Sequence, residues 1–321
     1  MDLNLPIFDQ LKDSKRILIA GMGGGFDIFC GLPLYFTLKD RGYEVHLANY
    51  SFSAIAYFAA NGHGQALTST LMGVDASIDD TFIYFPELYL SQWFRAQRGE
   101  DVTIWAFHKT GGKQLLENYR VLTRRLGIDT IILVDGGVDS LMRGDEAMVG
   151  TMLEDSVSLA CVNALQAEEI HTRIVACIAF GAELHMAYAH VMENIAAFTR
   201  EGAFFGSCSL LPQMPVYQQY ESAVLYAHEQ PHQDYSVINS SVISAVQGHY
   251  GNYHLTPKTH GSRLWISPLM NIYWFFDLPQ MAAWNLLNPA LLETETFREM
   301  MFVASRIIQS VSGRKNGQMP I

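Results

Sequence analysis

Two stretches of the sequence combine glycines with acidic side chains. Residues 21–27 read GMGGGFD, and residues 134–146 read VDGGVDSLMRGDE. Consecutive glycine N–H groups can form a nest for an anion, whereas clustered carboxylate oxygens are the ligands that Mg²⁺ prefers. The second stretch has four carboxylates and one arginine, although charged residues make up 17% of the chain. The two stretches together predict a site for a small anionic ligand. Whether Mg²⁺ is bound there as well is left open by the sequence.

The residue types suggest a role for each group. Ligand binding would fall to the glycine turns, their neighbours and a later NSS motif: Gly23, Gly24, Gly25, Asp27, Gly136, Gly137, Ser140, Asn239 and Ser240. Metal binding would fall to Asp135, Asp139, Asp145 and Glu146. Asp135 and Asp139 are also candidates for positioning a nucleophile, and Arg143 for balancing developing negative charge. The plainer alternative is a solvated turn in which Asp139 and Arg143, four residues apart, form an ordinary ion pair.

A second group of candidates lies in ELHMAYAHVMEN, within a helical pattern that we expect over residues 182–200. His190 and Glu193 are three residues apart and share one helical face, so they are candidates for a general base or acid. His185 and His190 are five residues apart, which does not fit the i, i+4 histidine pair of zinc metalloproteases. The alternative for these residues is a polar or interfacial helix face.

Elements that would position these groups recur along the chain. Five β-branched apolar runs, each followed by a turn and a helical pattern, begin at Arg16, Tyr43, Asp101, Asp129 and Thr172. This alternation predicts an α/β, Rossmann-like three-layer fold with a mostly parallel central sheet. Because parallel strands end at the same edge, we expect a common crevice there. It would gather Asp27, Asn49, Lys109, Asp135 and Gly181.

The last third has a different pattern. VINSSVISAVQGHYGNYH predicts a helix closed by Gly248, RLWISPL predicts a strand, and an aromatic segment follows as MNIYWFFDLPQMAAWNLL. Its aromatic side chains predict core packing, with a homo-oligomer contact as the alternative. Since no linker-like composition separates this part, we expect a single domain over residues 1–321, elaborated from about residue 203.

Composition narrows the function classes. The net charge is −11, and no block of Lys or Arg is present to neutralise a nucleic-acid backbone. No apolar run approaches the roughly 20 residues of a membrane span, and the N-terminal residues lack a signal-peptide pattern, so we expect a cytoplasmic protein. An NAD site is disfavoured, since Phe26 stands at the third glycine position of the dinucleotide motif and Asn49 ends the second strand.

GGVDS, within the second stretch, resembles the Ser-Gly-Gly-x-Asp-Ser pyrophosphate loop of ATP pyrophosphatases. In that superfamily the loop follows the first strand, whereas here it follows a later one and Asp135 replaces the leading serine. Taken together, GGGFD, FPE, DGGVDSLMRGDE, HVMEN, NSSVISA and GSRLWISPLM–YWFFDL resemble the uncharacterised domain-of-unknown-function 1152 family. That resemblance implies a Rossmann-like α/β fold and supplies no activity. The family's motif positions correspond here to Gly23–Asp27, Glu87, Asp135–Glu146, His190, Glu193, Asn194 and Asn239–Ser241. The resemblance adds weight to Glu87 and His190.

Three functions follow as expectations. The first is a cytosolic enzyme, a hydrolase or transferase, acting on a small phosphorylated or nucleotide-like metabolite at the carboxyl edge of the sheet. The second is an ATP-dependent ligase or amidase with a displaced pyrophosphate loop. The third is a non-catalytic ligand-binding or assembly protein.

Overall fold

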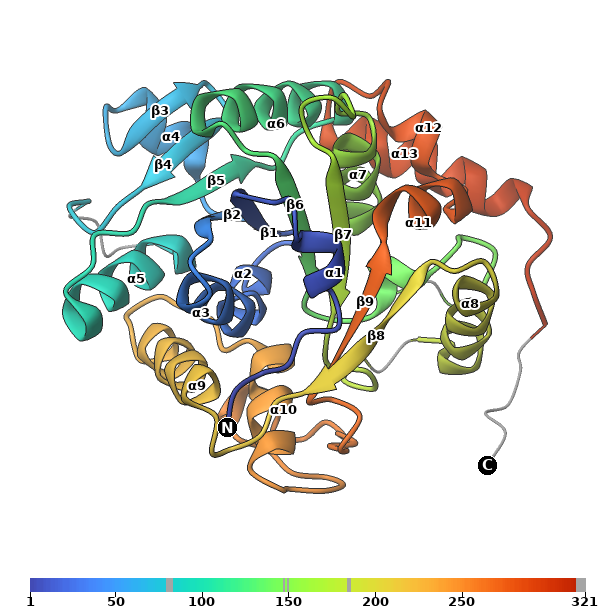
Figure 1. The fold of residues 1–321 in the computed structure, drawn as a ribbon. Helices are drawn as coiled ribbons and strands as arrows, with labels where there is room; N and C mark the ends of the chain where they lie inside the picture. Colours follow the sequence, from blue (N-terminus) through green and yellow to red (C-terminus); the bar gives the residue numbers. More distant parts are fainter. Residues whose placement is uncertain (79–82, 147, 149, 184–185, 316–321) are drawn as a thin grey trace.

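The computed structural model describes residues 1–78, 83–146, 148, 150–183 and 186–315, and its centre is one nine-stranded sheet (Figure 1). The five predicted strands form its parallel block: β1 (Arg16–Gly21), β2 (Glu44–Ser51), β5 (Ile104–His108), β6 (Thr130–Asp135) and β7 (Thr172–Cys177). Their order across the sheet is β5-β2-β1-β6-β7. This confirms the predicted α/β fold with its mostly parallel sheet.

Antiparallel strands extend the block on both sides. On one side lie β4 (Leu71–Val74) and β3 (Gln65–Thr68), and on the other β9 (Ile272–Asp277) and β8 (Phe204–Ser209). The strand predicted from RLWISPL is wrong, because that segment makes only an isolated bridge between Ile266 and Gly251. The strand β9 instead occupies the aromatic segment, where Tyr273, Phe275 and Phe276 are buried. These three rings are therefore core, as predicted, whereas Trp265 is exposed.

Helices cover both faces of the sheet. One face carries α1 (Phe8–Leu11), α2 (Asp27–Cys30), α3 (Leu32–Asp40), α5 (Pro86–Trp93), the π-helix Phe94–Arg98, α9 (Pro215–His228) and α10 (Val237–Val246). The other carries α6 (Gly112–Leu126), α7 (Leu153–Asn163), α8 (Tyr188–Arg200), α11 (Leu278–Trp284), α12 (Asn288–Leu291) and α13 (Phe297–Ser310). Helix α4 (Ile55–Ala60) packs near the β4 edge. Two short 3₁₀ turns complete the elements, Asp139–Leu141 and Pro257–Thr259.

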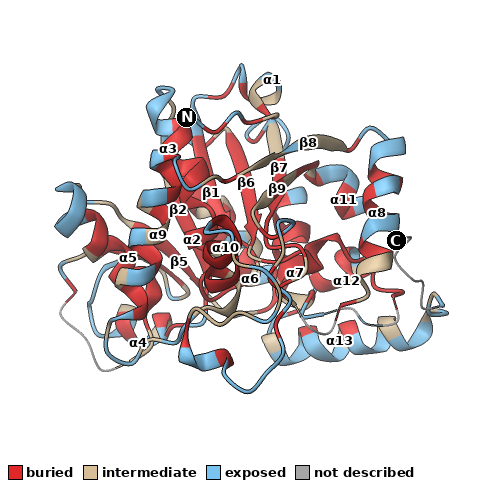
Figure 2. Cartoon of the chain, turned by 90° about the horizontal axis from the view of Figure 1, so that it is seen from below, coloured by how far each residue is buried: buried red, intermediate tan, exposed pale blue. Residues whose placement is uncertain are grey.

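Alternation along the strands explains the two cores. In β1, Ile17 and Ile19 pack on the first face, and Leu18 and Ala20 on the second. Successive side chains of a strand point to opposite faces, so a strand covered on both sides has to be apolar throughout. Figure 2 shows the result, with buried strands between helices whose outer faces are exposed.

The structure corrects the start of one predicted helix and confirms the glycine predicted to close another. The helix expected over residues 182–200 begins at Tyr188, so Glu183 precedes it. The helix α10 is followed by Gly248 at φ 85, as predicted for a closing glycine. No helix among the described residues is long and apolar enough to cross a membrane.

The strand order fixes where a ligand site would form. The strand β2 lies on one side of β1, and β6 lies on the other. The boundary between β1 and β6 is therefore the switch point of the sheet, where the order of the strands changes direction. At such a switch point the loops after two adjacent strands diverge and leave a crevice at their carboxyl ends. The GMGGGFD and DGGVDS turns follow these two strands.

Candidate functional site

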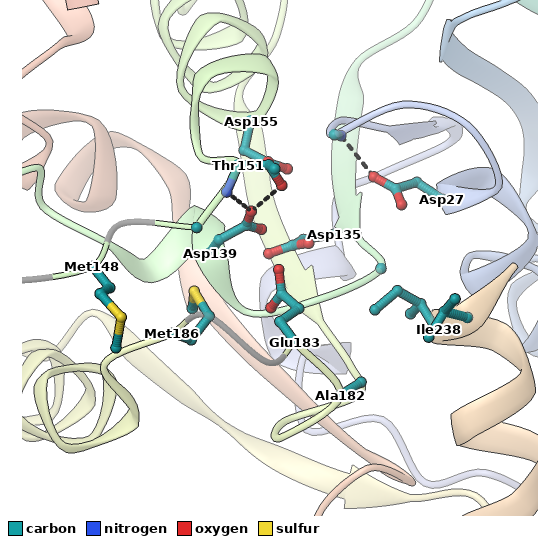
Figure 3. A pocket seen from close by; sticks show the side chains of 14 residues that line it. Asp27, Asp135, Asp139, Met148, Thr151, Asp155, Ala182, Glu183, Met186 and Ile238 are labelled. Atoms are coloured by element: carbon teal, nitrogen blue, oxygen red, sulfur yellow. Dashed lines mark hydrogen bonds between the residues drawn. The ribbon is translucent and has the colours of Figure 1, made fainter. Parts of the chain in front are cut away.

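A cavity of about 760 Å³ occupies this switch point. Five acidic side chains line it: Asp27, Asp135, Asp139, Asp155 and Glu183. Figure 3 shows the carboxylates of Asp135, Asp139 and Glu183 directed toward one another, with Met148 and Met186 along one side and Ile238 on the opposite side. No Lys, Arg or His is among the described residues that line the cavity. His185, weighed above as a candidate, lies outside the described residues.

Asp27 opens helix α2 directly after the glycine turn. Its Oδ2 accepts a hydrogen bond from the N–H of Gly23 at 2.7 Å (Figure 3). Burial raises the pKa of Asp27 to about 8, although hydrogen bonds from the backbone of Gly23, Gly136 and Gly24 act in the opposite direction. The carboxyl is therefore held by the two glycine turns together.

Asp135 and Asp139 come from the turn after β6. The Oδ2 of Asp135 accepts from the N–H of Ser140 at 3.1 Å. The Oδ2 of Asp139 accepts from the N–H and the hydroxyl of Thr151 at 2.9 and 2.7 Å. Burial is the main cause that raises the pKa of both carboxyls, and the negative charge of Asp139 adds to it at Asp135.

Asp155 and Glu183 complete the group and were not among the candidates from the sequence. Asp155 lies in the first turn of α7, is 2% exposed, and its Oδ1 has no hydrogen-bond partner among the described residues. The Oε2 of Glu183 accepts from the N–H of Val138 at 3.1 Å. Burial and then neighbouring carboxylates raise the pKa of both groups well above the ordinary range. Because parallel strands end at the same edge of the sheet, Gly181 was expected there, and the same rule applies to Glu183, two residues later. Asp155 does not follow a strand, so this rule could not have found it.

Close packing of carboxylates explains the glycines. A Cβ on Gly23 would lie 2.7 Å from Asp155 Oδ1 and 2.8 Å from Asp27 Oδ2, and one on Gly136 would lie 2.6 Å from Asp27 Oδ1. A Cβ on Gly137 would lie 3.0 Å from Glu183 Oε2. Any larger residue would push these oxygens apart.

The need for glycine at position 24 has a different cause. Gly24 has φ +103, and the ring of Phe52 covers it at distances that leave no room for a Cβ. Gly25 also has a positive φ, of 60. The three consecutive glycines therefore serve backbone conformation and close approach of the chain's own side chains.

Backbone donors expected to hold a phosphate have partners within the chain. The N–H groups of Gly23, Val138 and Ser140 donate to Asp27, Glu183 and Asp135 respectively. The turns thus bind carboxylates of the protein, and these carboxylates present their remaining oxygens to the cavity. A cation would meet that surface more favourably than an anion would.

The oxygens of Asp27, Asp135 and Asp155 are arranged compatibly with a cation. One ligand atom from each lies within 4.8 Å of the others, among the described residues. Hard cations such as Mg²⁺, Mn²⁺ and Ca²⁺ take carboxylate oxygens at about 2.0–2.6 Å, which brings ligands on opposite sides of the ion to about this separation. Asp139 and Glu183 stand beside this triad.

Glu87 and Asn49 support the glycine turn without lining the cavity. The Nδ2 of Asn49 donates to the carbonyl of Gly25 at 2.9 Å and to Glu87 Oε1 at 2.8 Å, and Ser53 donates to Glu87 Oε2. Burial raises the pKa of Glu87. Lys109 pairs with Glu154 at 2.9 Å and lines a neighbouring cavity that shares Gly150 and Thr151 with the first.

The NSS motif lies on α10, whose first residues Val237 and Ile238 line the cavity. Ser236 caps the helix by accepting from the N–H of Asn239. Asn239 itself is buried and donates to the carbonyl of Phe26 at 3.3 Å. Ser240 and Ser241 line a separate small cavity. Asn239 therefore ties α10 to the glycine turn, and Ser240 does not reach the acidic cavity.

The remaining candidates meet at another place. Arg314 contacts Asp145, Glu146, Glu193 and Asn194, and His190 Nε2 lies 2.9 Å from the carbonyl of Lys315. Arg143 pairs with Asp145 at 2.8 Å, so the ion pair expected between Asp139 and Arg143 does not form. None of these residues lines the cavity among the described residues.

Residues 87–309 match the family described as "Protein of unknown function (DUF1152)". The chain belongs to this family. Four of the five cavity acids lie within the matched region, as do the four residues that contact Arg314. Asp27 lies before it and Arg314 after it. No curated protein and no solved structure matches the chain.

Proposed function

We propose that this chain is a cytosolic enzyme, a hydrolase or transferase, that uses a divalent cation to act on a small phosphorylated or nucleotide-like metabolite. The observation that carries the proposal is the buried Oδ1 of Asp155, which has no partner among the described residues and lies in a cavity with four other carboxylates. A buried carboxylate oxygen without a donor is costly unless a cation or a proton meets it.

Asp27, Asp135 and Asp155 would hold the cation. A bound Mg²⁺ or Mn²⁺ would supply neutralisation of a phosphate's charge and a template for its orientation. Asp139 and Glu183 lie beside the triad and are the candidates to accept or return a proton at their carboxylate oxygens. The glycine turns would act indirectly, because their N–H groups fix the carboxylates.

The apolar side chains of the cavity would take the rest of the substrate. Met148, Met186 and Ile238 lie around the carboxylates (Figure 3), and a cavity of about 760 Å³ has room for a ligand the size of a small metabolite. The anionic group of the substrate would bind the cation that the triad holds. A ring or carbon chain of the substrate would pack against the apolar side chains.

The alternative functions receive less support. An ATP pyrophosphatase loop would need free N–H groups after β6, yet those of Val138 and Ser140 donate to carboxylates of the chain. A non-catalytic binding protein would use the same cavity and cation, and would differ by showing no turnover.

The test is Mn²⁺ binding by the full chain, measured by calorimetry after EDTA treatment. Asp155→Asn should weaken Mn²⁺ binding by at least about 100-fold, the upper end of the loss seen when partners supporting metal ligands are removed. Asp27→Asn provides a second variant, at another residue of the triad. Asp101→Asn is the matched control, since Asp101 is exposed and lies outside the cavity.

Circular dichroism in EDTA should show that both variants are folded. Unchanged Mn²⁺ affinity in folded Asp155→Asn, or no binding by the wild type, would contradict the proposal. A thermal-shift series of nucleotides and sugar phosphates, with and without Mn²⁺, then identifies the substrate class. Ligands that stabilise the protein only with Mn²⁺ are the expected result, and candidates so found are assayed for turnover.

A further inference from the structure

Arg314 is bound by four polar side chains that close around its guanidinium group. Nε lies 2.9 Å from Asp145 Oδ1, and NH1 lies 3.0 Å from Asn194 Oδ1 and 3.3 Å from Glu193 Oε2. NH2 contacts Glu146 Oε1, and the backbone N–H of Arg314 donates to the carbonyl of Asp145. We call Asp145, Glu146, Glu193 and Asn194 the guanidinium socket. Their positions match the planar fork of donors that distinguishes arginine from lysine.

Three of the four socket residues have polar contacts besides those with Arg314, and one of them, Asp145, also pairs with Arg143 at 2.8 Å. Glu146 accepts from the N–H of Arg143 and of Gly144, both at 2.8 Å, and from Asn194 Nδ2 at 2.9 Å. Asn194 Nδ2 also donates to the carbonyl of Leu141 at 2.9 Å. Glu146 and Asn194 are buried. Buried carboxylates such as those of Asp145 and Glu146 are costly without a cationic partner, and a guanidinium group supplies both the charge and the donors.

His190 provides a second anchor for the same segment. It is 1% exposed, its Nε2 lies 2.9 Å from the carbonyl of Lys315, and its Nδ1 has no partner among the described residues. The socket and His190 lie within the matched family region, whereas Arg314 and Lys315 lie beyond it. The receiving surface thus lies within the residues that match the family, and its occupant lies outside them.

The socket and the acidic cavity both take residues from the loop between Asp139 and Thr151. Asp139 and Thr151 close the loop through two hydrogen bonds at its base, and both line the cavity. Between them, Leu141, Asp145 and Glu146 contact the socket or its occupant. Met148 and Gly150, on the returning side, line the cavity again. Movement at the socket would therefore displace one wall of the cavity.

We infer that the socket is a guanidinium-binding site, filled here by Arg314, through which the C-terminal segment 311–315 holds the cavity wall in its binding conformation. The effect on cation binding rests on the proposed function, whereas guanidinium recognition and loop ordering do not. The occupant is this chain's own arginine, and a free guanidinium compound would share its chemistry.

The experiment uses the full chain with Arg314→Ala, Arg314→Lys and the control Arg306→Ala, an arginine of α13 that faces the Phe302 ring outside the socket. Hydrogen exchange of loop residues 139–151 and Mn²⁺ affinity are the two measurements. We expect exchange in the loop to rise at least about 10-fold in Arg314→Ala, and the Mn²⁺ dissociation constant to rise about 5-fold. Millimolar methylguanidinium should reverse both changes, and methylammonium should not.

Each result bears on the inference separately. Arg314→Lys should behave nearly as Arg314→Ala, because one ammonium cannot reproduce the fork. Unchanged loop exchange in Arg314→Ala would overturn the inference, and equal rescue by methylammonium would overturn guanidinium recognition. If the wild type binds no Mn²⁺, the proposed function fails, while loop exchange and rescue still decide the inference.

Discussion

The acidic cavity and the guanidinium socket each take two acids from residues 134–146, and the charges of these acids have different neighbours in the two places. Asp135 and Asp139 enter the cavity, where no Lys, Arg or His lies among the described lining residues. Asp145 and Glu146, a few residues later, are neutralised by Arg143 and Arg314. The carboxylates of the socket face arginine side chains, whereas those of the cavity face one another and accept hydrogen bonds from the backbone or from Thr151.

Under the proposed function, this difference separates acids that stabilise the fold from acids that bind the cation. A buried carboxylate in an ion pair contributes to a folded conformation, and removing its partner is costly. A buried carboxylate among like charges destabilises the folded state and persists where a ligand offsets the cost. The comparison therefore predicts opposite responses to the same kind of substitution, which can be measured.

The largest expected effect is a dependence of stability on pH in the cavity. Asp27 has a pKa of about 8 in the folded protein against an ordinary value of 3.8, so its contribution to stability is present below pH 3.8 and is lost as the pH rises to about 8. In EDTA, the wild type should lose up to about 5 kcal/mol relative to Asp27→Asn between pH 4 and 8, from 1.36 kcal/mol per pKa unit.

Urea denaturation of both proteins across this pH range measures the effect. Taking the difference between the two proteins removes the contribution of titrating groups that do not interact with Asp27, and retains that of the neighbouring carboxyls coupled to it. Adding Mn²⁺ should recover the loss in the wild type alone. A difference that stays constant with pH would mean that Asp27 is ionised in the metal-free protein, and the contrast with the socket would then lose its basis.

A smaller effect is expected from Glu146→Gln in the socket. It removes a charge that faces Arg314 and three further donors, so the free energy of unfolding should fall by about 3 kcal/mol. Asp155→Asn replaces an ionisable group in the cavity by a neutral one, and Asp155 Oδ1 has no donor among the described residues. In EDTA its free energy of unfolding should stay equal or rise. A fall of similar size in both variants would contradict the comparison.

The smallest effect is expected from Glu193→Gln. The side chain of Glu193 is 57% exposed and its contact with Arg314 is 3.3 Å, so solvent screens the pair. The free energy of unfolding should change by less than about 0.5 kcal/mol. Urea denaturation alongside Glu146→Gln checks this, and a loss comparable to that of Glu146→Gln would show that the socket distributes its energy evenly.

Much of the architecture could be predicted from local pattern. The five parallel strands follow from continuous apolar runs, and the placement of Asp27 and Asp135 in one cavity follows from the shared edge of their strands. Glu183 was within reach of the same rule. Asp155 was not, because an acidic residue in the first turn of an apolar helix is equally typical of an exposed helix start.

The roles of His190 and Glu193 could not be predicted from their spacing. Residues three apart share a helix face, but spacing does not say what packs against that face. Here it receives residues 314 and 315. RLWISPL likewise has a strand-like composition, but the segment that pairs with β7 is β9.

The sequence by itself determined the layers, the switch point and the presence of acidic turns at it, because these depend on side-chain periodicity and on the direction of parallel strands. Tertiary structure decided which acids would be neutralised by distant segments of the chain. Asp145 and Glu146 meet Arg314, about 170 residues away in the chain, whereas Asp135 meets Asp27 and Asp155. The physical reason is that local pattern sets where a charge emerges, and the packing of distant segments sets which charge it faces.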